Sequence, residues 1–252
     1  MTTDGGYAAT VGELGDRRAR KKAQTRELIR SVARRLFNER GFETVTIADI
    51  ARECDVAVQT VFNHFATKEE LFFDGRTRWV DSPAEAVRSR QPSVPPLTAL
   101  RAHLVDAVAE RVGAHRCAER RRTIATLEAS DALRAYERQL MHEAEQKLRQ
   151  ALLDAWSSDD TPSPPDPEPA ALLIAAVWVA AVGSLVLGQR PALSAGADPE
   201  VAAATAMDLA DRVLRQLEIG ANAVHGHKRA PVTGMAAPQA DTGWPQAVRR
   251  AG

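Results

Sequence analysis

Amide, hydroxyl and imidazole side chains alternate with apolar ones between Asp55 and Phe72. Val61 and Phe65 stand four residues apart, the spacing of one helical face, and are predicted to point into a core. Their neighbours then face outward. An amide side chain can pair bidentately with adenine in the major groove, and an apolar group can contact a thymine methyl. The pattern predicts base contacts from Val58, Gln59, Thr60, Phe62 and Asn63.

Residues suited to binding phosphate flank this segment. Thr46 and Lys68 stand at the starts of two predicted helices, where free N–H groups and the helix dipole favour an anion. Residues 17–40 hold ten Lys or Arg and two Asp or Glu, although the formal net charge of the chain is zero. A local excess of this kind is the electrostatic footprint expected for a nucleic acid. We predict an arm that follows the DNA backbone or enters the minor groove, made of Arg17, Arg18, Arg20, Lys21 and Lys22.

Three helices must position these groups. The first is predicted over residues 16–40, where apolar residues recur at helical spacing, and Gly41 ends it. A second helix opens at Thr46, with Asp49 in the capping-box position three residues on. The third covers about residues 58–65, after a short turn, so the pair is a helix-turn-helix unit. Its predicted core is Ile29, Leu36, Phe37, Phe42, Ile47, Ile50, Val56, Val61 and Phe65.

The stretch from Gln24 to Asp74 resembles the DNA-binding domain of the TetR (tetracycline-repressor-type) transcriptional regulators. The resemblance rests on LFNERGFE, TVTIADIA, TVFNHF and TKEELF, in this order and spacing. It implies phosphate contacts from Thr46, His64 and Lys68. Two turn positions depart from the family pattern. Asp55 replaces the usual Gly, and Ala57 replaces a frequent Ser, which leaves the third helix without a side-chain cap.

The rest of the chain predicts further helices and no strands. A fourth helix starts at Thr67, and others are expected over 97–112, 119–130, 131–156, 170–187 and 199–217. Pro-rich breaks separate them at 89–96 and 157–169. The predicted fold is all-α, with a helix-turn-helix domain over 17–74 and a helical ligand-binding and dimerisation domain over 75–220. Residues 1–16 are predicted to be a disordered tail and 221–252 a flexible one.

The resemblance implies that the second domain pairs two subunits and binds a small-molecule effector. Helices 170–187 and 199–217 are the predicted dimer interface, because a monomer would expose their apolar side chains. A twofold dimer places its reading helices about 34–36 Å apart, so the double-stranded DNA operator should be nearly palindromic. The effector, expected to be largely apolar, would release the protein from DNA. Candidate pocket residues are Trp79, His103, Tyr136 and Trp178.

Some residues have plainer interpretations that the sequence leaves open. Gln59, Thr60 and Asn63 could form an ordinary solvated face, and Phe62 could belong partly to the core. His64 could be a surface residue without a partner, and the basic run over 17–22 could serve solubility alone.

Other functions compete with a ligand-responsive repressor. The same fold could act as an activator, and segment 170–187, uncharged over 18 residues, could place a sensor at a membrane. An enzyme is not expected, because the histidines show no metal-ligand spacing and no Gly-rich phosphate loop occurs. We expect no cofactor and no metal. Cys54 and Cys117 lie outside any metal-binding spacing and no secretory signal is seen, which favours a cytoplasmic protein.

Overall fold

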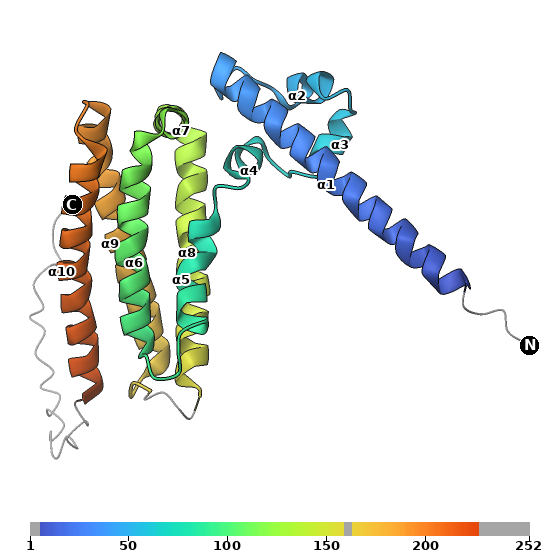
Figure 1. The fold of residues 1–252 in the computed structure, drawn as a ribbon. Coiled ribbons are helices and arrows are strands. Elements are labelled where there is room, and N and C mark those ends of the chain that lie inside the picture. The colour runs from blue at the N-terminus through green and yellow to red at the C-terminus, as the bar shows by residue number, and fades with distance from the viewer. Residues whose placement is uncertain (1–5, 159–162, 227–252) are drawn as a thin grey trace, which may run out of the picture.

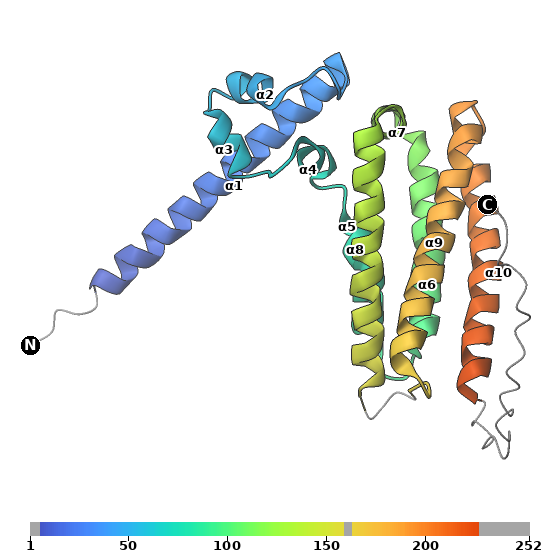
Figure 2. The ribbon, with the colours of Figure 1, turned by 180° about the vertical axis from the view of Figure 1, so that it is seen from behind.

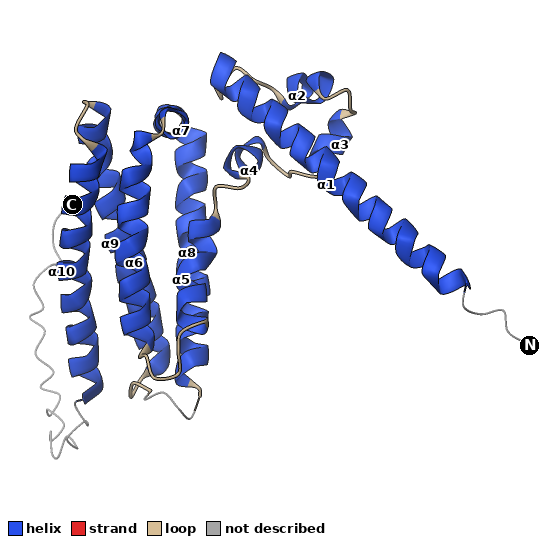
Figure 3. Ribbon diagram, viewed as in Figure 1, coloured by secondary structure: helices blue, strands red, loops and turns tan. Residues whose placement is uncertain are grey.

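The computed structural model describes residues 6–158 and 163–226, and every regular element in these two segments is helical (Figure 3). The first group of helices holds α1 (Gly6–Arg40), α2 (Ile47–Glu53), α3 (Val58–Phe62) and α4 (Lys68–Phe73). The second group holds α5 (Arg78–Arg88), α6 (Pro96–Gly113), a 3₁₀ turn (Ala114–Arg116), α7 (Ala118–Ala129), α8 (Asp131–Trp156), α9 (Pro167–Ser194) and α10 (Pro199–Gly226). Figure 1 shows the two groups side by side, joined through α4. The all-α prediction is confirmed for the described residues.

A small aromatic core holds α1 to α4 together. The rings of Phe37, Phe42 and Phe72 pack with centroids 5.2–6.1 Å apart. Val61 and Phe65, the two inward residues predicted for the third helix, are buried. Large buried aromatic side chains remove much apolar area from water, so a few rings stabilise a domain this small. Of the other predicted core members, Ile29, Leu36 and Ile50 are buried, and Ile47 and Val56 pack at the edge.

The turn between α2 and α3 is built from the residues that depart from the family pattern. Asp55 has a φ of 53°, in the left-handed region that glycine enters more easily. The Val56 amide donates to the Ala51 carbonyl at 3.0 Å and closes the turn. Ala57 supplies no side-chain cap to α3, as predicted. The short α3 therefore depends on its buried residue Val61 for its position.

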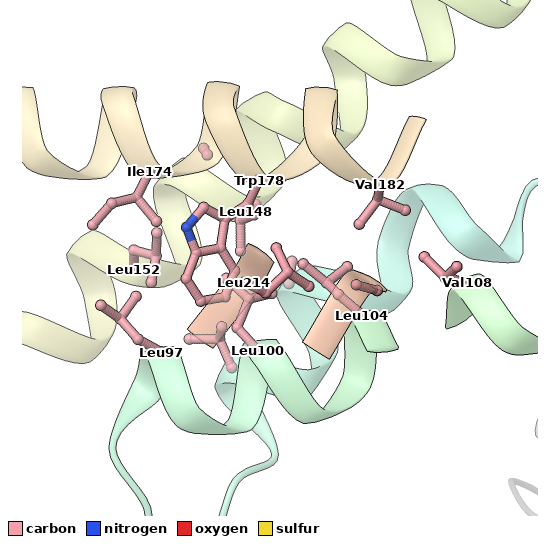
Figure 4. Close-up of a cluster of buried hydrophobic side chains, with 14 of the residues drawn as sticks. Leu97, Leu100, Leu104, Val108, Leu148, Leu152, Ile174, Trp178, Val182 and Leu214 are labelled. Carbon is pink, nitrogen blue, oxygen red and sulfur yellow. The ribbon is translucent and has the colours of Figure 1, made fainter. Parts of the chain in front are cut away.

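The second group of helices encloses a separate apolar core. Figure 4 shows Trp178 of α9 reaching toward Leu100 of α6 and Leu214 of α10, with Leu148 and Leu152 of α8 close by. These side chains are 0–1% exposed. Many small residues, alanines above all, let the helices approach closely around the indole ring.

Side chains from both groups meet at the junction between α4 and α8. The rings of Phe73 and Tyr136 stack with centroids 5.4 Å apart, and the Ser130 hydroxyl donates to Glu43. Within the first group, Asp74 directly after α4 accepts a hydrogen bond from Arg26 of α1 at 2.6 Å, which ties α4 to α1. A displacement within the second group of helices can therefore reach α4 through direct contacts.

The first helix is longer than predicted. It begins at Gly6, so the prediction of a disordered tail is wrong for residues 6–16, and residues 1–5 lie outside the described residues. Once a helix is nucleated, each added residue brings a hydrogen bond of its own, so a small and polar segment can continue it. At the other end α10 reaches Gly226, and the remainder of the tail predicted over 221–252 lies outside the described residues.

Two further differences concern the helical domain. Helix α5 was not predicted separately; Gly75, with a φ of 70°, ends the preceding helix and allows a new one to begin at Arg78. Helix α9 begins at Pro167 and continues past the predicted end to Ser194, although Pro191 lies inside it. Proline removes one helical hydrogen bond, but packing on neighbouring helices holds the last turn.

Candidate nucleic-acid interface

The outward face of α3 carries the predicted base-reading side chains. Val58 and Phe62 are 41% and 44% exposed, while Val61 on the opposite face is fully buried. Gln59 and Asn63 are exposed, and the Gln59 amide donates to the Asn63 side-chain oxygen at 3.2 Å. Thr60 is half-buried at the rim. The interpretation of Phe62 as partly core is wrong, because its ring lies on the solvent side.

Thr46 is engaged in capping its own helix. Its hydroxyl donates to the Asp49 carboxylate at 2.6 Å and accepts from the Asp49 amide at 3.1 Å, which completes the predicted capping box. Hydrogen bonds from the Thr46 hydroxyl and amide lower the pKa of Asp49 to about 2. A phosphate can take the Thr46 hydroxyl hydrogen only if that hydrogen leaves Asp49.

Lys68 ties α4 to the turn between α1 and α2. Its Nζ donates to the carbonyls of Phe42 at 2.9 Å and Val45 at 3.2 Å, and it lies 4.1 Å from the centre of the Phe42 ring. An ammonium group has three hydrogens to donate, so one is left for a phosphate. Lys68 therefore has a structural role that the sequence did not reveal, beside its predicted DNA contact.

His64 lies at the C-terminal edge of α3, next to α1. It is half-buried, and its Nδ1 has no hydrogen-bond partner among the residues that the structure describes. Burial, followed by the charges of Lys22 and Arg26, lowers the pKa of His64. Arg26 also donates to the His64 carbonyl at 2.6 Å and covers the Phe65 ring at 4.1 Å. The ring is thus held beside positive charge, where a phosphate is favoured.

The predicted basic arm is part of a helix. Arg17, Arg18, Lys21 and Lys22 are exposed on the N-terminal half of α1, which projects away from the rest of the domain (Figure 1). Their charges therefore lie along a rod. Contact with the DNA backbone suits this geometry, whereas entry of an extended chain into the minor groove requires that this part of α1 unwind.

The predicted pocket residues are only partly brought together. Trp79 and His103 line a narrow cavity of about 40 Å³ with Leu104, Met141 and Val179. Tyr136 stacks instead at the junction with α4, and Trp178 lies in the core of the bundle. Neither residue lines this cavity, because packing draws large aromatic rings into cores.

Sequence reasoning missed two charged members of the same cavity. Arg111 and Glu137 line it, and Glu137 is only 9% exposed. The signal for Arg111 was available, because it stands eight residues after His103 on one face of the same helix. Glu137 gave no such signal. Within residues 6–158 and 163–226, no group of three or more His, Cys, Asp or Glu is placed to hold a metal ion.

Comparison with known proteins supports the assignment of α1 to α4. Residues 29–74 match the family model of bacterial regulatory proteins, tetR family. No curated protein matches the chain. The solved structures that resemble it include NalD, the secondary repressor of the MexAB-OprM multidrug efflux pump in Pseudomonas aeruginosa, at 23% identity over 77% of this chain and 96% of that chain, with a TM-score of 0.47.

Two other solved structures show similar levels of resemblance. A SmeT–triclosan complex is 21% identical over 75% of this chain and 91% of that one, with a TM-score of 0.47. Salmonella enterica GusR is 19% identical over 80% of this chain and 95% of that chain, with a TM-score of 0.44. The assignment rests on the family match and on the helix-turn-helix geometry described above. Residues 29–74 therefore form a DNA-binding domain of the type found in bacterial regulatory proteins of the tetR family.

Proposed function

We propose that this protein is a dimeric, ligand-responsive transcriptional regulator, most simply a repressor, which binds a near-palindromic DNA operator. The outward face of α3 is the observation that carries the proposal. Gln59 and Asn63 are exposed with their amides side by side, and Phe62 leaves an apolar ring on the same surface. An isolated solvated face has no need of an exposed phenylalanine, whereas a thymine methyl offers it a partner.

The proposed dimer uses the far side of the bundle. Figure 2 shows α9 and α10 on the edge away from α1 to α4, where a partner would leave both reading helices free. Large apolar side chains on the two helices are exposed, an arrangement that a second copy of the chain would bury. They are Leu172, Leu173, Val177 and Leu187 of α9, and Val201, Met207, Leu209, Val213 and Ile219 of α10.

The membrane alternative rests on the same surface. Helix α9 is long and apolar enough to cross a membrane by length and composition, with a mean hydropathy of 2.5 over its most apolar window. One face of it, including Trp178 and Val182, packs inside the bundle. We favour a core helix of a cytoplasmic regulator. Recovery of the protein in the membrane fraction after lysis without detergent would favour the sensor at a membrane instead.

Release from DNA would pass through α4. A ligand that binds one arrangement of the bundle more tightly shifts the equilibrium by its difference in affinity, typically about 1–3 kcal/mol. The hollow next to the narrow cavity is lined by Phe72 and Phe73 of α4 as well as by Trp79 and Arg111. Because α4 also carries Lys68, a shift of α4 would alter the support of α2 and hence the position of the reading helix.

The test is a fluorescence-anisotropy titration with the DNA upstream of the gene. We expect tight binding that weakens steeply with salt, because phosphate contacts release counterions. Gln59→Ala should relax the preference at one base pair, and Lys22→Ala should weaken binding to all sequences alike. If the protein binds this DNA no more tightly than it binds random DNA, the proposal is wrong. Transcript levels in a deletion strain separate a repressor from an activator.

The dimer has its own test. Leu173→Glu places a charge at a side chain that is 65% exposed in the single chain, and should convert the dimer to a monomer in sedimentation velocity. Leu28→Glu is the matched control, because Leu28 is also an exposed leucine but lies on α1. A wild-type protein that sediments as a monomer would remove α9 and α10 as the interface.

A further inference from the structure

Positive charge is concentrated around the cavity beside Trp79. Arg111 borders that cavity and three adjoining hollows, of which the two outer ones enclose about 430 and 370 Å³. Six arginines and three glutamates line the four spaces together, in a chain whose formal net charge is zero. The arginines are Arg34, Arg76, Arg78, Arg111, Arg120 and Arg190, and the glutamates are Glu110, Glu119 and Glu137.

The glutamates do not neutralise this charge. Glu137, the buried one, lies 2.9 Å from Arg190 and forms an ion pair with it. Glu110 and Glu119 are exposed at the outer rim. Exposed carboxylates are screened by water and contribute little to the stability of an inner charge. Glu137 therefore serves Arg190, and among the described residues Arg76, Arg111 and Arg120 have no dedicated counter-ion.

Arg111 is the centre of the cluster. Its guanidinium lies 4.8 Å from the centre of the Trp79 ring and forms no hydrogen bond or ion pair with any residue that the structure describes. Burial lowers the pKa of Arg111 to about 10, with Arg190 and Arg120 acting in the same direction and Glu137 opposing. The group stays charged at neutral pH. A half-buried charge with unused donors is costly unless an anion pairs with it.

Arg76 and Arg120 extend the cationic surface toward α4. Arg76 donates to the Phe72 carbonyl, and its guanidinium lies 5.0 Å from the centre of the Phe72 ring. Burial and the charges of Arg34 and Arg120 lower the pKa of Arg76 to about 10. Arg120 is half-buried and, within the described part of the chain, has no hydrogen-bond partner.

The inner end of the same space is mostly apolar, and the one carboxylate that lines it, Glu137, is paired with Arg190. Leu104, Met141, Val179 and Leu187 line the narrow cavity together with the Trp79 ring. A molecule that spans both parts would place an anionic group among the arginines and an apolar or aromatic tail beside Trp79. Guanidinium groups bind carboxylates and phosphates bidentately, with charge-assisted hydrogen bonds.

We propose that the effector is a small anion, a carboxylate or a phosphate ester, with an aromatic or apolar tail, and that Arg111 binds its anionic group with Arg76 and Arg120. This anion site deepens the proposed function, and the regulatory role of its ligand rests on that function. It replaces the expectation of a largely apolar ligand. Since Arg76 contacts Phe72 of α4, an anion that draws Arg76 inward would displace α4, which supports α2 and the reading helix α3.

The test measures ligand binding in the absence of DNA. Isothermal titration of the purified full-length protein compares 3-phenylpropanoate with 3-phenylpropanamide, which has the same shape and no charge. The carboxylate should bind at least about tenfold more tightly, since charge-assisted hydrogen bonds contribute more than neutral ones. Phenyl phosphate and inorganic phosphate complete the series. Tighter binding of phenyl phosphate than of the carboxylate assigns a phosphate ester, and the reverse assigns a carboxylate.

Matched variants locate the site. Arg111→Gln should abolish the difference between the acid and the amide, whereas Arg138→Gln, at an exposed arginine of α8, should keep it. Circular dichroism checks that each variant folds, and Arg120→Gln replaces Arg111→Gln if the latter does not. The proposal is overturned if no anion binds at millimolar concentration, if acid and amide bind the wild type equally, or if both arginine variants lose the difference alike.

The two proposals fail in different ways. An anion that binds with the expected dependence on Arg111 but leaves operator affinity unchanged supports the anion site and removes its regulatory role. Operator binding with no anion binding in the titration leaves the regulator intact and removes the anion site.

Discussion

The two groups of helices differ in whether charged side chains are buried in their cores. In α1 to α4 the core is apolar and aromatic, and capping bonds such as that between Thr46 and Asp49 join residues three apart in the sequence. In the bundle, charged groups lie inside, and their partners come from distant helices, as with Glu137 and Arg190. The caps of α2 and the outward face of α3 therefore follow local rules, whereas the proposed effector site exists only after the helices have packed.

This difference between the two groups of helices matches the tasks proposed for them. A DNA-reading surface must be exposed and rigid, so its side chains can be positioned by one short helix and its caps. A regulatory pocket must respond to a ligand, and buried charge supplies a large free-energy change when an anion arrives. The predictions below test this contrast, from the largest expected effect to the smallest.

Substitutions on the buried and the exposed side of the α3 region should differ most in their effects on stability. Phe65→Ala removes a side chain that is 1% exposed and should lower the free energy of unfolding by about 3–5 kcal/mol. Phe62→Ala, at an exposed ring, should change it by less than about 0.5 kcal/mol and weaken operator binding instead. Urea unfolding and anisotropy measure the two effects. Equal loss of stability in both variants would place Phe62 in the core after all.

Charge inside the bundle should be the next most sensitive feature. Arg190→Leu leaves the buried Glu137 without its ion-pair partner and should cost about 3 kcal/mol, the low end for such a loss because Arg111 lines the same cavity. The double variant Glu137→Leu/Arg190→Leu should recover most of this loss. Thermal unfolding measures the stability of the two variants against the wild type. A double variant no more stable than the single one would contradict the role of unpaired charge.

The cap of α2 should show a defined dependence on acid. The folded-state pKa of Asp49 is about 2, below its ordinary value of 3.8. The carboxylate therefore stabilises the fold above about pH 4 and loses this contribution as the pH falls from 3.8 toward 2. The stability difference between wild type and Asp49→Asn should shrink over that interval. A difference that stays constant down to pH 2 would mean that the cap is not charge-dependent.

The smallest effect is expected for His64. Burial and the nearby Lys22 and Arg26 lower its pKa in the free protein. A phosphate beside the ring would favour the protonated form, so binding takes up a proton and operator affinity should rise modestly as the pH falls from neutral. The rise should be absent in His64→Gln. An identical pH profile for both proteins would remove His64 from the phosphate contacts.

Local patterns predicted the parts of the fold that local physics decides. The bounds of the helix over 131–156, the cap at Thr46 and the inward position of Val61 all agree with the structure. Each depends on residues within one or two helical turns. The start of α1 and the separate α5 were missed, because glycine and turn signals state only a tendency that neighbouring helices can override.

The pocket shows the limit more clearly. Four aromatic or imidazole residues were expected there, and the structure brings only Trp79 and His103 into one cavity. Tyr136 and Trp178 are of the right chemical type but serve packing. The arginine cluster joins residues of five helices and the loop after α4, and no spacing along the chain connects Arg76 to Arg190.

By itself, the sequence determined that this protein is helical, that α2 and α3 form a helix-turn-helix unit, and which side chains of α3 face outward. Helical period and capping chemistry act over a few residues, so one short segment holds all the residues that decide these features. The tertiary structure alone decided that Lys68 supports the turn at Phe42, that Trp178 is core, and that arginines gather around Arg111. These outcomes depend on the burial and mutual distance of residues far apart along the chain, and packing sets both.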